Sequence, residues 1–182
     1  MPSKGEFVDG RRVFGLAGWS GSGKTTLLTQ LLPALIQRGL TVSTLKHAHH
    51  DFDIDQPGKD SHRHREAGAT EVLVASDQRW ALMHELRGAP EPSLEELLTH
   101  LGPVDLVIVE GFKRAALPKL EIHRPSVGKP LMATDDKTIV AVASDVMLPG
   151  LAIPCLALER VDTIAAFIID HCGLKGSRRG AA

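Results

Sequence analysis

The segment from Gly18 to Thr25 constrains the fold of this chain more than any other part of the sequence. It reads Gly-Trp-Ser-Gly-Ser-Gly-Lys-Thr and matches the pattern G-x-x-x-x-G-K-[ST] at every fixed position. Residues 12–17 form an apolar run directly before it, and residues 26–37 place leucines at helical spacing after it. A strand, a glycine-rich turn and a helix in this order favour a phosphate cradle (P-loop) over an accidental glycine-rich turn.

The glycines of this segment explain how it would hold phosphate. Gly18, Gly21 and Gly23 let the backbone turn its N–H groups inward, into a concave nest at the positive end of the following helix. We therefore expect the whole segment to contact the phosphates of a purine triphosphate. The expected nucleotide-binding residues of the segment are Gly18, Trp19, Ser20, Gly21, Ser22, Gly23, Lys24, Thr25 and Thr26.

Four side chains of the segment have individual expected roles. Lys24 should reach the β and γ phosphates, which also makes it a catalytic candidate. The Thr25 hydroxyl is an expected Mg²⁺ ligand, and Thr26 can bond an α-phosphate oxygen from the first helical turn. Trp19 either stacks on a ligand bound above the loop or, as an ordinary tryptophan would, packs against the protein.

Short apolar runs alternate with helical patterns along the rest of the chain. This alternation predicts an α/β fold of the P-loop NTPase type, with a mainly parallel sheet and helices on both faces. The expected strands are residues 12–17, 41–45, 71–75, 105–109, 119–122, 139–143 and 153–158. The expected helices are residues 26–37, 60–67, 93–100, which opens with a Ser-x-x-Glu capping box, and 161–172.

Length and composition set further limits. A chain of 182 residues with 43 % hydrophobic residues fits one nucleotide-binding domain, expected over residues 1–174, with a disordered tail at 175–182. A net charge of −1 gives no general attraction to nucleic acid, and the longest apolar runs are too short to cross a bilayer. Cys155 and Cys172 lack metal-type spacing, and residues 1–10 lack an apolar signal core, so we expect a cytoplasmic protein.

Glu110 is a second candidate for metal binding and catalysis. Residues 105–109 read as a buried strand that delivers Glu110 to its carboxyl end, where ligands gather in open α/β sheets. We expect Glu110 to face the magnesium ion, acting through a coordinated water because glutamate is longer than the aspartate usual at this place. The alternative is an acid that caps the following loop.

Residues 46–65 are polar and hold five of the nine histidines. We interpret them as a switch-type loop that covers the nucleotide or a second anion, with Asp51 or Asp53 reaching the magnesium ion. A zinc site built on the histidines and nearby carboxylates is the alternative. The basic residues that would offer positive charge are Lys59, Arg63 and Arg65, and the histidines that could bind zinc are His47, His49 and His50.

With these motifs taken together, the chain resembles the MobB family of molybdopterin-guanine dinucleotide biosynthesis. The likeness covers roughly residues 13–172, and it depends on several motifs beyond the cradle, which alone would not single out a family. The motifs are Thr44-Leu-Lys46-His47-Ala-His49, Asp53-x-Asp55-x-Pro57-Gly58-Lys59-Asp60-Ser61, Ala67-Gly68-Ala69 and Val109-Glu110-Gly111-Phe112-Lys113.

The resemblance implies a homodimeric GTP-binding protein with weak, magnesium-dependent GTPase activity. It also implies work beside a MobA-type nucleotidyltransferase that joins GMP to molybdopterin, with molybdopterin or its cofactor form as a further partner. The sequence has no Asn-Lys-x-Asp motif for reading guanine, so the choice of GTP over ATP comes from the resemblance alone. Asp145 follows an expected strand and is a candidate to pair with the N1–H and N2 amine of guanine; an ordinary turn residue is the alternative.

Two other classes of protein would use the same cradle. A P-loop small-molecule kinase would need an acceptor site with a base and mobile arginines, which residues 59–65 could supply. An interaction module would use the nucleotide only to order a dimer. Slow GTP hydrolysis, phosphorylation of an acceptor and no hydrolysis at all would separate the three readings.

Overall fold

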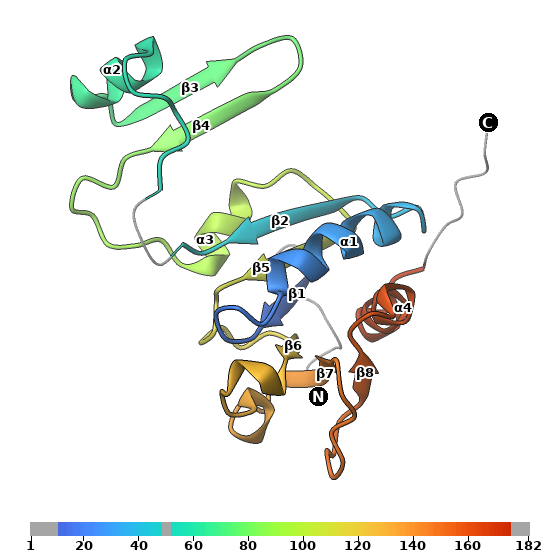
Figure 1. The fold of residues 1–182 in the computed structure, drawn as a ribbon. Coiled ribbons are helices and arrows are strands. Elements are labelled where there is room, and N and C mark those ends of the chain that lie inside the picture. The colour runs from blue at the N-terminus through green and yellow to red at the C-terminus, as the bar shows by residue number, and fades with distance from the viewer. Residues whose placement is uncertain (1–10, 49–51, 176–182) are drawn as a thin grey trace. The chain divides into compact units, whose positions relative to one another are not determined.

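The computed structural model describes residues 11–48 and 52–175, which form two compact units. The first unit comprises the described residues up to His47 and from Leu97 onward. The second comprises the described residues between Ala48 and Glu96. The elements of both units are labelled in Figure 1.

The first unit contains a six-stranded sheet in which every neighbouring pair of strands is parallel. The strand order is β2-β5-β1-β6-β7-β8, so β1 lies inside the sheet between β5 and β6. This confirms the predicted mainly parallel sheet. The strand bounds are β1 (Arg12–Ala17), β2 (Val42–Lys46), β5 (Leu106–Glu110), β6 (Lys119–His123), β7 (Ile139–Ser144) and β8 (Cys155–Ala157).

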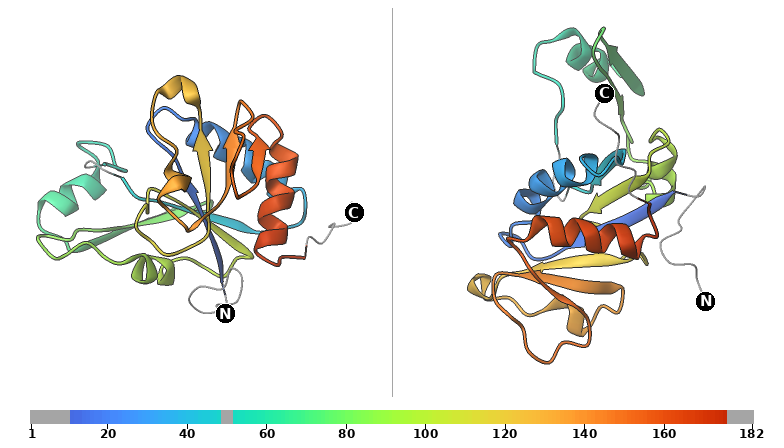
Figure 2. Two further views of the ribbon diagram at one scale, coloured as in Figure 1. Left: turned by 90° about the horizontal axis from the view of Figure 1, so that it is seen from below. Right: turned by 90° about the vertical axis from the view of Figure 1, so that its right-hand side faces the viewer.

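Two helices lie side by side on one face of this sheet, α1 (Lys24–Ile36) and α4 (Val161–His171) (Figure 2). Side chains alternate along a strand, so every second residue of the inner strands points toward these helices. The result is one apolar core between the sheet and the helix pair. Its fully or nearly fully buried members include Phe14, Leu16, Leu31, Leu35, Leu106, Ile108, Leu120, Ile122, Ile164 and Ile168.

Helix α1 continues past Pro33 and ends at Ile36. Proline has no N–H, so the helix loses a backbone donor there without being interrupted. Gly39 then adopts a left-handed conformation, with φ at 85°, and its N–H donates to the carbonyl oxygen of Ile36 at 2.9 Å. Gly39 therefore ends the helix.

The opposite face of the sheet carries polar as well as apolar side chains. Gly15 of β1 makes room for them, because a Cβ atom there would lie 2.7 Å from Leu117 Cδ1 and 2.8 Å from Lys119 Cγ. Two short 3-10 helices, η1 (Pro125–Val127) and η2 (Met132–Thr134), lie between β6 and β7. Neither was expected from sequence, because three-residue helices leave little periodicity to detect.

The second unit holds a short helix, α2 (Asp60–Glu66), and a two-stranded antiparallel hairpin of β3 (Glu71–Ala75) and β4 (Trp80–His84). The strand predicted at residues 71–75 is confirmed as β3, whereas β4 was not expected from sequence. β3 pairs with β4 and with no strand of the six-stranded sheet. Leu73 and Leu82 face each other across the hairpin and are both exposed, so the apolar pattern of β3 does not reflect burial in the main sheet.

Helix α3 (Leu94–Thr99) begins at the end of the second unit and finishes in the first. Its capping box is confirmed: the Ser93 N–H donates to Glu96 Oε2 at 2.7 Å, and the Glu96 N–H donates to Ser93 Oγ at 3.1 Å. These bonds lower the pKa of the Glu96 carboxyl. A single domain over residues 1–174 stays a prediction, and residues 176–182 of the expected tail lie outside the described residues.

Candidate functional site: the phosphate loop and the strand ends around it

The segment from Gly18 to Gly23 forms a loop between β1 and α1, as the pattern requires. Gly18 has φ at 144°, and a Cβ atom on it would lie 2.5 Å from the carbonyl oxygen of Ile122 and 2.7 Å from Ser22 Oγ. Any larger residue would therefore collide with the backbone of β6. The glycine at this position is imposed by close packing as well as by the turn.

Lys24 is the first residue of α1 and is half-buried over the loop. Its Nζ donates to the carbonyl oxygens of Gly18 at 2.9 Å and Trp19 at 3.0 Å. Burial lowers the pKa of Lys24, the charge of Glu110 opposes this effect, and Lys113 and Lys46 lower the pKa further. A phosphate anion in the loop would favour the charged form of Lys24, so the site is electrostatically suited to a triphosphate.

The N-terminus of α1 is open to a ligand. Gly23 precedes the helix in a left-handed conformation, no side chain caps the first turn, and no acidic residue lies in it. Thr25 and Thr26 are exposed in this turn. The Ser22 hydroxyl is buried and makes no hydrogen bond with any described residue. A helix end with open N–H groups and no acid is a suitable site for an anion.

Glu110 is the last residue of β5 and is 8 % exposed. It lies beside Leu16 of β1 and Lys46 of β2 in the parallel register. Its carboxylate forms no hydrogen bond with another described residue, and its charge acts on Lys24. The nearly buried Glu110 carboxylate and the exposed Thr25 hydroxyl are hard oxygen donors of the kind that magnesium prefers. Their chemistry fits a magnesium ion, although the metal roles of both residues stay predictions.

Two of the sequence motifs meet at the end of β2. The His47 N–H donates to the carbonyl oxygen of Glu110 at 2.9 Å, and the His47 ring packs edge-on against Phe112 with centroids 5.4 Å apart. Gly111 has φ at 94°, and a Cβ atom there would lie 2.7 Å from the His47 carbonyl oxygen. The Lys-His and Glu-Gly-Phe-Lys motifs therefore form one packed structure beside the phosphate loop.

Arg124 links the phosphate loop to the end of β7, and sequence reasoning missed it. Its Nε donates to the carbonyl oxygen of Ser22 at 3.1 Å, and its Nη1 pairs with Asp145 Oδ2 at 2.9 Å. Asp145 is thus positioned next to the loop, as its proposed role requires, but guanine binding stays a prediction. The rule that identified Glu110 would have found Arg124, because Arg124 directly follows the carboxyl end of β6.

Trp19 is held by contacts with residues that follow β5 and β6 in the chain. Its Nε1 donates to the carbonyl oxygen of Pro130 at 2.8 Å. The ammonium groups of Lys113 and Lys129 lie 5.4 and 5.9 Å from the centre of its indole ring. Both ammonium groups are within the distance of a cation–π contact. Packing of Trp19 against the protein is therefore present, and contact with a nucleotide stays a prediction.

Asp53 belongs to the second unit and has a partner there. Its Oδ1 accepts from Arg65 Nη2 at 2.7 Å, while Asp55 and Glu85 each accept from the same guanidinium at 2.9 Å. These three carboxylates, Glu85 most of all, raise the pKa of Arg65 above its ordinary value. The structure thus gives Asp53 a structural partner, and magnesium binding by Asp53 stays a prediction.

Most residues of the zinc alternative, and the second candidate acid for magnesium, Asp51, are not among the residues that the structure describes. His49, His50 and Asp51 lie outside the described residues. Within residues 11–48 and 52–175, no group of three or more His, Cys, Asp or Glu side chains is placed to hold a metal ion. The ion pairs of Arg65 also occupy one of the arginines on which the kinase alternative depends.

The fold and the loop define the class of this protein. A glycine-rich loop between the inner strand β1 and helix α1, with an acid at the end of the adjacent strand β5, is the arrangement of a P-loop α/β protein. The family model of MobB, described as molybdopterin guanine dinucleotide synthesis protein B, matches residues 13–145. The chain belongs to the MobB family.

Relatives and solved structures agree with this assignment. The molybdopterin-guanine dinucleotide biosynthesis adapter protein of Escherichia coli (strain K12) is 44 % identical over 157 residues, covering 85 % of this chain and 89 % of the relative. The adapter protein of the same name from Haemophilus influenzae is 44 % identical over 159 residues, covering 86 % of each chain. A crystal structure of molybdopterin-guanine biosynthesis protein B is 28 % identical with a TM-score of 0.68, covering 87 % of this chain and 98 % of that chain.

Family membership places the chain in molybdopterin-guanine dinucleotide biosynthesis, in the role of an adapter protein. Within the part of the chain that the structure describes, no helix has both the length and the apolar character needed to span a membrane.

Proposed function

We propose that this adapter protein binds GTP with magnesium in the phosphate loop, hydrolyses it slowly and acts beside a MobA-type nucleotidyltransferase. The observation that carries the proposal is the loop itself. The loop glycines Gly18, Gly21 and Gly23 have positive φ, Lys24 is half-buried, and the first turn of α1 is uncapped, and these features together support an anion site. A triphosphate is the anion that would use all three.

The magnesium ion is held by Thr25 and Glu110 in this proposal. When bound, the ion neutralises charge on the β and γ phosphates and favours attack on the γ-phosphate. Glu110 is nearly buried, and its negative charge raises the pKa of Lys24. The carboxylate and the ammonium therefore interact electrostatically. Lys24 would attract the phosphate oxygens to the loop, and Glu110 would help to hold the ion through a water.

Guanine is read at the end of β7 in this proposal. The Asp145 carboxylate is 35 % exposed and lies at the loop through its ion pair with Arg124. A carboxylate can accept from both the N1–H and the N2 amine of guanine, whereas adenine offers no such pair of donors. Asp145 thus supplies a physical reason for a preference for GTP.

The protein acts as a homodimer in this proposal, and the hairpin of the second unit supports that choice. Leu73, Leu82 and Trp80 share one face of the hairpin and are 60, 39 and 65 % exposed. A two-stranded hairpin with a bare apolar face is marginally stable in water, and a second copy would cover it with the same surface. Sedimentation of the wild-type protein and a Leu73→Asp variant tests this point: the variant should sediment as a monomer.

A phosphate-release assay tests the proposed activity. GTP with magnesium should be hydrolysed slowly without any acceptor, and addition of a molybdopterin-bearing nucleotidyltransferase should change the rate. The Glu110→Gln variant should lose more hydrolysis than GTP binding, whereas a matched Glu159→Gln variant at an exposed position should keep both.

Two outcomes would contradict the proposal. Transfer of the γ-phosphate to a small acceptor would make the protein a kinase. Equal losses of binding by Glu110→Gln with and without magnesium would make Glu110 a structural residue rather than part of a metal site.

A further inference from the structure

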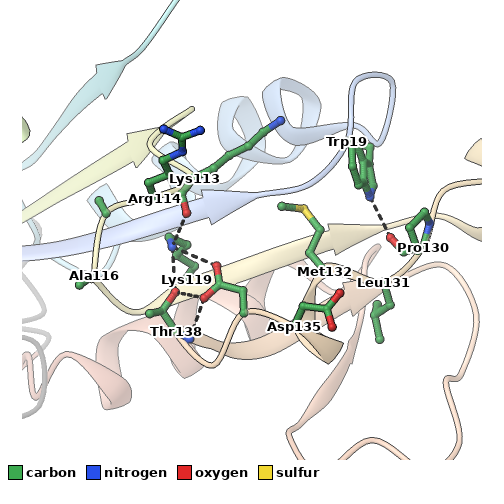
Figure 3. Close-up of a pocket in the computed structure, with 12 residues that line it drawn as sticks. Trp19, Lys113, Arg114, Ala116, Lys119, Pro130, Leu131, Met132, Asp135 and Thr138 are labelled. Atoms are coloured by element: carbon green, nitrogen blue, oxygen red, sulfur yellow. Dashed lines mark hydrogen bonds and ion pairs between the residues drawn. The ribbon is translucent and has the colours of Figure 1, made fainter. Parts of the chain in front are cut away.

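A pocket lies beside the phosphate loop and is lined in part by Trp19 of that loop. It has a volume of about 560 Å³, within the range of small-molecule sites. Figure 3 shows its lining, which comes from three segments that are distant in sequence. The segments are the phosphate loop through Trp19, the loop after β5 through residues 113–116, and the stretch from Pro130 to Thr138 together with Lys119.

The pocket is rigidly built before any ligand binds. Lys119, nearly buried, donates from Nζ to the carbonyl oxygen of Lys113 at 2.9 Å, to Thr138 Oγ1 at 2.8 Å and to Asp136 Oδ2 at 3.1 Å. The fully buried Glu121 carboxylate accepts from the N–H groups of Met132 and Ala133, both at 2.8 Å. Because these bonds tie the walls together, a ligand would lose little free energy in ordering them.

The charges left over in the pocket favour an anion that also carries a hydrogen-bond donor. Asp136 neutralises Lys119, so neither contributes net charge. Lys113 and Arg114 are exposed at the rim and form no ion pair with any described residue. Asp135 is exposed and likewise forms no ion pair with a described residue, so its carboxylate can accept hydrogen bonds from a ligand.

The remaining walls favour a flat ring. The Trp19 indole lines one wall with the Lys113 ammonium 5.4 Å from its centre, and the Met132 side chain lies between Trp19 and Lys119 in the view of Figure 3. A thioether and an aromatic ring are the surfaces on which heteroaromatic rings pack. The pocket therefore combines a surface for a ring, cations for a phosphate and a carboxylate for an amino group.

We propose that this pocket binds a phosphate monoester that carries a flat 2-amino-4-oxo heterocycle, the chemistry shared by pterin phosphates and GMP. The N–H and amino group of such a ring pair with Asp135, and the phosphate pairs with Lys113 and Arg114. This choice of ring rests on the proposed function, because a dinucleotide of pterin and guanine joins two phosphate-bearing units. The shared Trp19 wall would place this ligand next to the nucleotide.

Calorimetric titration tests the proposal. The phosphate loop is first filled with magnesium and a non-hydrolysable GTP analogue, and the protein is then titrated with neopterin monophosphate, neopterin, GMP or inorganic phosphate. Neopterin monophosphate should bind saturably at one site. Neopterin and inorganic phosphate should each bind at least about tenfold more weakly, because each lacks one of the two recognised groups. If GMP binds with the same affinity as neopterin monophosphate, the pocket is assigned to the guanine-bearing phosphate ester. If GMP binds more weakly, the pocket is assigned to the pterin.

Matched variants locate the binding. Arg114→Ala and Asp135→Asn should each weaken binding by about tenfold or more, the loss of one charge-assisted hydrogen bond. Lys137→Ala removes an exposed cation of the same loop that does not line the pocket and should leave binding unchanged.

The proposal fails if neither phosphate monoester binds, or if both pocket variants bind as tightly as Lys137→Ala. The affinity of the GTP analogue in the same preparations checks the phosphate loop separately. Failure of the pocket and failure of the proposed function are therefore distinguishable.

Discussion

Arg124 donates a hydrogen bond from Nε to the carbonyl oxygen of Ser22, 3.1 Å away, and so fixes the phosphate loop to the carboxyl end of β6. The same guanidinium pairs with Asp145. The loop that should hold phosphate and the acid that should read guanine are therefore coupled through one side chain.

Replacing Arg124 with Ala should weaken GTP binding by about tenfold, because both the loop and Asp145 lose a charge-assisted bond. Arg124→Lys keeps the charge but lacks the planar fork, so it should recover only part of the affinity. Calorimetry with GTP and ATP measures both effects. If Arg124→Ala keeps wild-type affinity and selectivity, the proposed coupling is wrong.

Gly18→Ala should prevent nucleotide binding and lower stability. The new Cβ would meet the Ile122 carbonyl oxygen at 2.5 Å, on a backbone with φ at 144°. Gly102→Ala is the control, because nothing lies within 4 Å of its Cβ and its φ is ordinary. This control should leave stability within about 1 kcal/mol of wild type. Urea unfolding of both variants gives the comparison, and equal stabilities would argue against the close packing of the loop.

Removal of the Asp136 carboxylate should destabilise the fold by about 3 kcal/mol, because it leaves the nearly buried Lys119 charge without its partner. Asp135→Ala, at an exposed neighbouring position, should cost far less. Denaturant titrations at neutral pH measure both losses. A small effect at Asp136 would show that the Lys119 cluster is not a structural requirement.

The ion pair of Asp136 and Lys119 also predicts that the stability of the fold depends on pH. Burial raises the pKa of Asp136, but hydrogen bonds from Thr138 and Lys119 outweigh it and lower the pKa below the ordinary 3.8. The charged carboxylate is thus stabilised in the folded state. The contribution of the Asp136 carboxylate to the free energy of unfolding should be fully present above pH 3.8. It should be lost as the pH falls through the lowered pKa of Asp136. The stability gap between wild type and Asp136→Ala should therefore narrow only at strongly acidic pH.

The two cysteines should differ in reactivity. Cys172 is fully buried, and burial raises its pKa to about 11 although Arg12 opposes the effect. Cys155 is only partly buried. Because the thiolate is the reactive form, a maleimide at pH 8 should label Cys155 in the folded protein and Cys172 only after unfolding. Peptide mapping checks this, and rapid labelling of Cys172 would contradict the packing of α4.

Much of the first unit could be predicted from sequence because its signals are local. Residues 12–17 and 139–143 are apolar runs bounded by turn residues, and the structure confirms both as strands to within one residue. Glu110 could be placed at a strand end because buried parallel strands read as unbroken apolar runs. The family likewise followed from motifs that combine fixed residues at fixed spacing.

The contacts that the sequence did not show depend on long-range geometry. Arg124 reaches Ser22 across 102 positions, and Trp19 reaches Pro130 across 111, so no local pattern could indicate either pair. The hairpin strand β4 was missed because Trp80 to His84 alternates weakly and lies next to exposed loops. Its partner β3 could be predicted as a strand but not assigned to a sheet, because its apolar residues give the same pattern whether buried or exposed.

Calorimetric titration of the wild-type protein and Lys24→Ala with GTP, in the presence and absence of magnesium, tests the central claim most directly. The ammonium of Lys24 now bonds two loop carbonyl oxygens and should turn to the phosphates when GTP binds. We expect wild-type protein to bind GTP more tightly with magnesium than without it, and more tightly than ATP. Lys24→Ala should lose most of this affinity while remaining folded. Unchanged GTP affinity in a folded Lys24→Ala protein would contradict the assignment of the phosphate loop.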